Sequence, residues 1–127
     1  MKKLRVVPPA FFVQKMCLMS QNKFATYLWF HSLYSRYQTD YEVVSGLLRI
    51  INLTVEKSES DLLLPIVKCG LCDSHVETQE SAIMVVERWR TKECLDALQT
   101  ASFSSKWIQA YAKAVASELK LEIGDVD

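Results

Sequence analysis

Hydrophobic residues recur at helical spacing over most of this chain. From Asn22 to about Tyr37, aromatic and leucine side chains fall three or four positions apart, which predicts a first helix. Asp40 is suited to cap a second helix running to about Leu53, because its carboxylate can accept hydrogen bonds from the first backbone N–H groups. The apolar stripe of this second helix is expected to comprise Val43, Val44, Leu47, Leu48, Ile50 and Ile51.

A polar stretch at residues 55–60 separates this helix from a third. We expect Ser60 or Asp61 to cap the third helix, because both side chains can accept hydrogen bonds from N–H groups of a first turn. Pro65 is compatible with a helix near its start, and the sequence places it there. The apolar residues of this helix are Leu62, Leu63, Ile66, Val67 and Leu71.

Ser74 and Glu77 indicate the start of a fourth helix. Their spacing matches a capping box, in which a hydroxyl and a carboxylate each accept a hydrogen bond from a backbone N–H. The helix should reach Trp89, so that residues 61–89 form a complete two-helix unit. An offset of 35 residues places its apolar stripe on that of the second helix, as expected for an internal repeat.

Two more helices complete the pattern. Thr91 can cap a short helix that the segment at residues 101–105 interrupts, and a serine of that segment begins the last helix, from Lys106 to about Leu121. The same offset of 35 puts Glu118 on an apolar position, as a terminal repeat can allow. Six helices in three hairpins predict an all-α fold.

The residues around two predicted turns resemble HEAT repeats. One turn, Cys72-Asp73-Ser74-His75, follows a leucine-rich helix and precedes a helix that opens with Val76-Glu77, and residues 37–51 are similar. The resemblance covers about residues 22–121 and implies a short solenoid of about three HEAT-like helical hairpins. Glu77 stands where many HEAT repeats have Arg. An irregular six-helix bundle is the alternative architecture.

The pattern divides the chain into three parts. We expect an N-terminal extension at residues 1–21 that packs on the first hairpin, a helical domain at residues 22–121 and an acidic tail at residues 122–127. Pro8 and Pro9 interrupt the apolar residues of the extension, which argues against a signal peptide. No apolar run approaches the roughly 18 residues of a membrane span. We therefore expect a soluble, cytoplasmic protein with no membrane partner.

Charge balance narrows the possible partners. The chain has 127 residues, in which 15 Lys and Arg balance 15 Asp and Glu, so a general attraction to nucleic acid is not expected. Its four cysteines, with no export signal beside them, should be reduced thiols. The pair Cys69 and Cys72 falls at the C-terminal end of a helix, where the helix dipole does not stabilise a thiolate. The sequence gives neither a paired zinc-ligand spacing nor a cofactor motif, so we expect no metal and no cofactor.

The two histidines do not predict an enzyme. His31 lies among aromatic residues of the first helix, and His75 lies at the start of the fourth. Neither has a nucleophile and an orienting carboxylate at a recognisable spacing. We therefore expect no catalytic residues.

Two clusters of charged and aromatic residues are the candidate protein-binding sites. Trp, Tyr and Arg carry a disproportionate share of the binding energy at protein interfaces. For Trp89 the alternative is inward packing. We expect both clusters to lie on the same side of the array. The first is Arg36, Tyr37, Tyr41 and Glu42, and the second is Glu87, Trp89 and Arg90 with their neighbours Arg88 and Lys92.

In size and expected fold the chain resembles small bacterial toxin-immunity proteins, including those of contact-dependent growth inhibition systems. This resemblance implies a non-enzymatic protein that binds a cognate protein toxin and blocks it sterically. An adaptor or scaffold in a larger assembly would share the same features. A nucleic-acid-processing protein or a thiol-redox protein is the remaining alternative.

Overall fold

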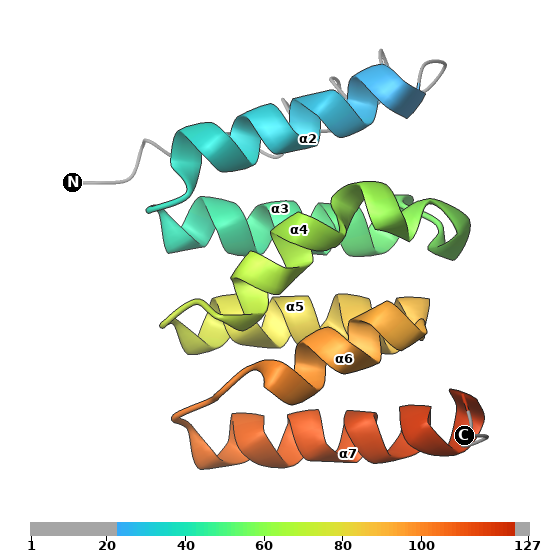
Figure 1. The fold of residues 1–127 in the computed structure, drawn as a ribbon. Helices are drawn as coiled ribbons and strands as arrows, with labels where there is room; N and C mark the ends of the chain where they lie inside the picture. Colours follow the sequence, from blue (N-terminus) through green and yellow to red (C-terminus); the bar gives the residue numbers. More distant parts are fainter. Residues whose placement is uncertain (1–22, 124–127) are drawn as a thin grey trace.

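The computed structural model describes residues 23–123, which form six α-helices and one short 3-10 turn and, within that range, no β-strand. The predicted all-α class is confirmed, and each of the six predicted helices is present. The expected N-terminal extension at residues 1–21 lies outside the described residues, as do residues 124–127 of the expected tail. The elements are α2 (Lys23–Tyr37), α3 (Tyr41–Thr54), η1 (Lys57–Glu59), α4 (Ser60–Leu71), α5 (Val76–Trp89), α6 (Lys92–Thr100) and α7 (Lys106–Ile123) (Figure 1).

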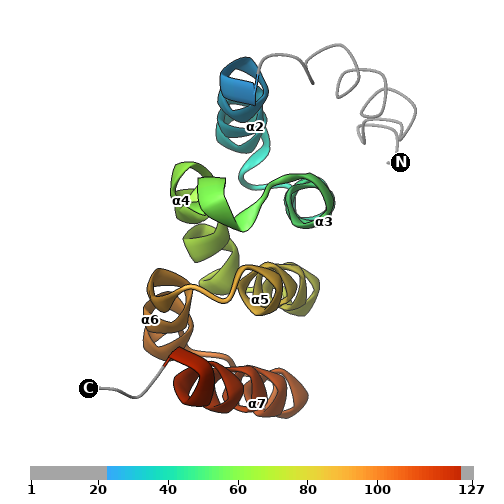
Figure 2. The same ribbon diagram turned by 90° about the vertical axis from the view of Figure 1, so that its right-hand side faces the viewer.

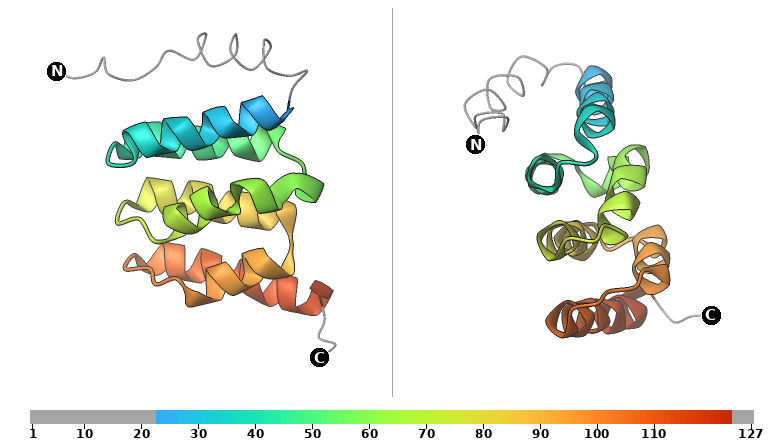
Figure 3. Two further views of the ribbon diagram at one scale, coloured as in Figure 1. Left: turned by 45° about the horizontal axis from the view of Figure 1, so that its top comes forward. Right: turned by 90° about the vertical axis from the view of Figure 1, so that its left-hand side faces the viewer.

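Successive helices run in opposite directions and alternate between two layers. One layer holds α2, α4 and α6, and the other holds α3, α5 and α7 (Figure 2). Within the second layer α5 contacts both α3 and α7, and within the first α4 contacts both α2 and α6. Short loops join α2 to α3, α4 to α5 and α6 to α7, and these three antiparallel pairs lie one after another (Figure 3).

The core lies between the two layers and is built from most residues of the predicted apolar stripes, although Leu62 of α4 is exposed. Leu47, Leu48 and Ile51 of α3 are fully buried, as are Ala82 and Ile83 of α5. Their burial follows from helical periodicity, since residues three or four apart share one face. Within residues 23–123, no helix combines the length and the apolar character that crossing a bilayer requires.

The predicted repeat offset holds for α3 and α5 and is wrong for α7. The first two helices have 14 residues each and begin at Tyr41 and Val76. The same offset from Val76 would start α7 at Tyr111, but the helix starts earlier, at Lys106. Equivalent hydrogen bonds in α5 and α7 support the observed register, in which Gln79 corresponds to Gln109. In each helix the glutamine Nε2 donates to the backbone carbonyl six residues earlier, at 2.6 Å. The repeat shortens because α6 has 9 residues where α4 has 12, and because only residues 90–91 join α5 to α6, whereas residues 55–59 join α3 to α4.

Two predicted helix caps are confirmed and two are wrong. The Asp40 carboxylate accepts from the backbone N–H groups of Glu42 and Val43, and the Thr91 side chain accepts from the N–H of Cys94. Neither Ser60 nor Asp61 caps α4, because Ser60 is already its first helical residue and the backbone of η1 leads directly into the helix.

The predicted capping box of Ser74 and Glu77 is absent. The N-cap of α5 is His75, and its side chain makes no capping bond. The Asp73 carboxylate instead accepts from the backbone N–H of His75 at 2.8 Å, which fixes the turn one residue earlier than Ser74 could.

Two further boundaries differ from the prediction. Pro65 is the sixth residue of α4 and therefore lies inside the helix, not near its first turn. It is exposed, so water can reach the carbonyl oxygen that lacks the usual N–H partner. At the other end α7 continues through Ile123, so the first two residues of the predicted acidic tail are helical. One of them, Glu122, forms an ion pair with Arg90.

Candidate functional site

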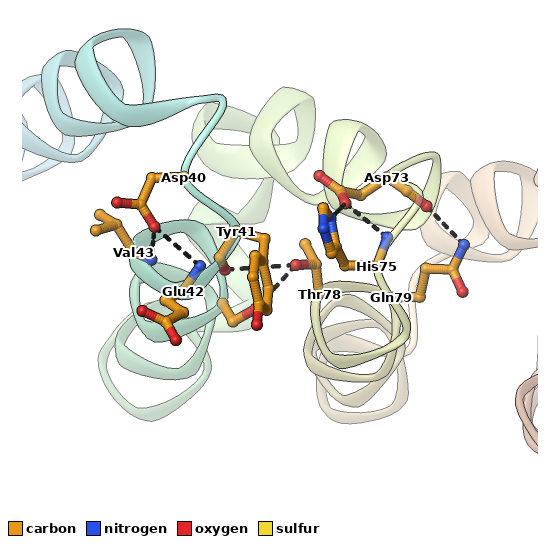
Figure 4. A network of polar contacts seen from close by, with 9 residues as sticks. Asp40, Tyr41, Glu42, Val43, Asp73, His75, Thr78 and Gln79 are labelled. Atoms are coloured by element: carbon orange, nitrogen blue, oxygen red, sulfur yellow. Dashed lines mark hydrogen bonds and ion pairs between the residues drawn. The ribbon is translucent and has the colours of Figure 1, made fainter. Parts of the chain in front are cut away.

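The turns between α2 and α3 and between α4 and α5 lie side by side at one end of the layers (Figure 4). In the second turn, Asp73 accepts from the His75 backbone and lies 3.0 Å from His75 Nδ1. Its carbonyl accepts from Gln79 Nε2 at 2.6 Å. The loop is therefore fixed by bonds to both sides of Asp73.

The two turns are joined by a ring stack and by a pair of hydroxyls. The rings of Tyr41 and His75 are parallel, with an interplanar angle of 4° and centroids 4.0 Å apart. The Thr78 hydroxyl donates to the Tyr41 carbonyl at 3.5 Å and shares a 2.8 Å hydrogen bond with the buried Ser45 hydroxyl. These contacts fix the start of α3 against the start of α5.

The first predicted cluster gathers at this end of the molecule. Tyr37 is half-buried and packs against the core, whereas Arg36 is exposed in the last turn of α2. Tyr41 is half-buried in its stack, and the neighbouring Glu42 is exposed. Glu42 and Tyr41 line a groove between α3 and α5 together with Ser45, Arg49 and Glu77.

The second predicted cluster lies at the opposite end, which corrects the expectation that both clusters share one side. Glu87 and Trp89 end α5, whereas Tyr41 begins α3, and the two helices run in the same direction (Figure 1). Residues 38–40 are a turn within a hairpin, and residues 90–91 connect one hairpin to the next. Because helices alternate in direction, these two kinds of connection lie at opposite ends.

Trp89 is fully buried, so its inward packing is what the structure shows, and it has no surface to offer a partner. Its indole Nε1 donates to the carbonyl of Val55 at 3.0 Å, and Arg88 Nη1 donates to the same oxygen at 2.7 Å. Val55 is itself fully buried at the end of α3. Trp89 therefore links the first hairpin to the second and cannot be a direct contact residue.

Arg90 and Glu87 are largely engaged within the chain. Arg90 has a φ of 56° and pairs with Glu122 at 2.7 Å and with Glu118 at 3.5 Å. The bond to Glu122 raises the pKa of Arg90 and lowers that of Glu122. Glu87 accepts from the Tyr111 hydroxyl at 2.8 Å. Burial, and then this bond, raise the pKa of Tyr111. These pairs attach α7 to the end of α5.

A larger exposed surface extends across the layer of α3, α5 and α7. Residues at positions i, i+7 and i+11 of a helix lie within about 40° of one another, on one line along its surface. In each of the three helices the series that starts at the second residue is exposed, on the side away from the buried stripe. We define the outer face as Glu42, Arg49 and Leu53 of α3, Glu77, Met84 and Arg88 of α5, and Trp107, Ala114 and Glu118 of α7.

Seven of these nine residues were absent from the predicted clusters, which included only Glu42 and, as a neighbour of Trp89, Arg88. The spacing of exposed positions in the sequence could have identified those in α3 and α5. The positions in α7 require the register that aligns Lys106 with Val76, which depends on the short α6.

The described cysteines differ in their exposure. Cys69 and Cys72 are exposed at the end of α4, and Cys94 is buried, which raises its pKa. His31 Nε2 lies 2.6 Å from the carbonyl oxygen of Leu62. Within residues 23–123, no group of three or more His, Cys, Asp or Glu side chains could hold a metal ion. Cys17 lies outside the described residues.

Comparison with models of protein families, with curated proteins and with solved structures gave no match to this chain.

Proposed function

We propose that this chain is a HEAT-like array of three helical hairpins that acts without catalysis, by binding another protein through its outer face. The observation that carries the proposal is the composition of that face. Trp107, Met84 and Leu53 are 52%, 39% and 77% exposed and alternate with charged side chains. Trp, Met and Arg are enriched at protein interfaces, where apolar anchors lie among polar groups.

The outer face is large enough for a protein partner. Glu42 and Leu53 are eleven residues apart, which corresponds to about 17 Å along a helix. Two spacings of about 9 Å separate the axes of α3 and α7. With about 5 Å of side-chain reach at each edge, the face covers on the order of 750 Å². A typical stable interface buries about 800 Å² of each partner.

The specific function that we propose is immunity: the chain binds a cognate toxin in the cytoplasm and covers its active cleft or its approach to substrate. A stack of helices joined by short loops suits this mechanism, because a preformed face loses little conformational entropy on binding. Charged positions such as Glu42, Arg49 and Arg88 would set the choice of partner by complementarity and by repulsion.

The test is capture from the cells that encode this chain, followed by mass spectrometry and an activity assay of the captured protein. Wild-type chain should capture one stable partner and inhibit its activity at a ratio of one to one. Trp107→Ala should lose capture, whereas Phe24→Ala, which alters an aromatic residue of similar exposure on α2, should retain it. Capture without inhibition would support an adaptor over an immunity protein. Failure to capture any stable partner would refute protein recognition.

A further inference from the structure

A groove between α6 and α7 lies on the side of the last hairpin that no other described helix covers. Its lining includes Lys106, Lys113 and Lys120, all exposed, and no residue that lines it is Asp or Glu. The chain as a whole has a formal net charge of zero, so this concentration of one sign is local. The half-buried side chain of Phe103 adds apolar surface to the groove.

The three lysines form one line along α7. They are seven residues apart, which places successive lysines about 10.5 Å apart along the helix, with a drift of about 20° at each step. Ala110 and Ala116 also line the groove, between the lysines in sequence. Small side chains at these positions let another helix approach to the usual separation of about 8–10 Å between axes.

The repeat register shows that two of these lysines stand where α5 has apolar residues, whereas Lys120 corresponds to the basic Arg90. In the register set by the helix starts, Lys106 and Lys113 of α7 correspond to Val76 and Ile83 of α5. Both of those residues pack in the core. A terminal repeat requires only a polar outer side, which mixed charges would provide equally well. Three cations with no carboxylate go beyond that requirement and create a positive potential along one groove.

We propose that this groove binds an acidic amphipathic helix of a partner protein. A helix lying along α7 has the same rise per residue, about 1.5 Å, so carboxylates at seven-residue intervals would meet all three lysines at once. Its apolar side would contact Phe103, Ala110 and Ala116. Phosphates of a nucleic-acid strand follow one another more closely than these lysines and match them less well. The groove is separate from the outer face and does not depend on its function.

The probe is a fluorescent three-heptad helical peptide built from Ala and Leu, with one Glu in each heptad. A matched peptide carries Gln at the same positions. By anisotropy with the full chain, the Glu peptide should bind at least about tenfold more tightly than the Gln peptide, and added salt should reduce the difference. Each of the substitutions Lys106→Glu, Lys113→Glu and Lys120→Glu should weaken binding by about three- to tenfold.

Two controls make the result specific. Lys92→Glu, at an exposed lysine of α6 outside the groove, and Met84→Glu, on the outer face, should leave peptide binding unchanged. A peptide with Lys in place of Glu should bind the triple Lys→Glu variant better than it binds wild type. Circular dichroism melts confirm folding, and a triple Lys→Gln variant replaces the triple Lys→Glu variant if reversal unfolds the chain.

Three outcomes would overturn the proposal. The first is a lack of measurable binding of the Glu peptide, which would make the groove only a polar end of the array. The second is binding that survives replacement of all three lysines. The third is a single-stranded oligonucleotide of equal charge that binds as tightly as the Glu peptide and depends on the same lysines, since the groove would then bind phosphates.

Discussion

Gly46 and Gly70 both lie inside helices, and replacing each with alanine should change stability in opposite directions. A Cβ atom at Gly46 of α3 would meet no atom within 4 Å. At Gly70 of α4 it would lie 2.8 Å from Leu48 Cδ1 and 3.0 Å from Ala82 Cβ. Both neighbours are fully buried, one in α3 and the other in α5. The absence of a side chain at Gly70 therefore lets three helices meet.

The expected changes in the free energy of unfolding follow from two terms, the helix propensity of alanine and the cost of overpacking. Alanine is favoured over glycine in a helix interior by about 1 kcal/mol. With no opposing contact, Gly46→Ala should raise the free energy of unfolding by about 0.5–1 kcal/mol. Carbon atoms pack at about 3.5–4.0 Å, so Gly70→Ala must displace α4 or distort the Leu48 rotamer. Such overpacking costs about 1–3 kcal/mol, which leaves a net loss of up to about 2 kcal/mol after the gain in helix propensity.

Urea unfolding followed by far-ultraviolet circular dichroism measures both changes. The gain in helix propensity is common to both variants, so their free energies of unfolding should differ by the overpacking cost of about 1–3 kcal/mol, which corresponds to a difference in Tm of several degrees. Adding Ala82→Gly to Gly70→Ala removes the 3.0 Å contact, so the two substitutions should be coupled favourably. Equal stabilisation by Gly46→Ala and Gly70→Ala would refute the close packing of α4 on α3 and α5.

Three other predictions concern single contacts. Trp89→Phe removes one of the two donors to the Val55 carbonyl, which keeps its bond from Arg88, and should lower the free energy of unfolding by about 0.5–1.5 kcal/mol in urea titration; an unchanged value would contradict a role for this bond. Thr91→Ala removes the N-cap of α6 and should cost about 1 kcal/mol, whereas Thr91→Ser should keep most of it. Burial and a hydrogen bond to a carboxylate raise the pKa of Tyr27 and Tyr111 in the folded state. Their contribution to the free energy of unfolding is therefore complete below pH 10.0, the usual pKa of tyrosine, and is lost as the pH rises above it. In thermal melts at alkaline pH, the Tm of the double Tyr→Phe variant should fall less steeply with increasing pH than the Tm of the wild type. Equal slopes would refute this linkage.

Local signals were sufficient to predict the helices. Their apolar periodicity depends on residues three or four apart, and the caps formed by Asp40 and Thr91 depend on neighbours within three residues. The cap of α5 was mispredicted because two acceptors competed for the same turn. The Asp73 carboxylate accepts the bond from the backbone N–H of His75, and Ser74 does not cap the helix. The sequence alone does not show which of these two acceptors is preferred.

The predicted binding residues depended on contacts that are distant in sequence, and here the sequence was less informative. Trp89 is buried because the carbonyl of Val55, 34 residues away, accepts its indole N–H. Arg90 pairs with carboxylates that the sequence analysis placed on an apolar stripe and in a tail. The outer face could be defined only with the observed register of α7, which depends on the length of the shorter third repeat.

The most direct test of protein recognition by the outer face is calorimetric titration of the captured partner with two matched variants. Met84 and Leu62 are 39% and 47% exposed, on α5 and α4, and so belong to opposite layers. Met84→Glu should weaken binding by about 2 kcal/mol or more, because a charge would be buried at the centre of the interface, whereas Leu62→Glu should leave the affinity unchanged. Loss of binding by Leu62→Glu with full binding by Met84→Glu would contradict recognition through the α3, α5 and α7 layer.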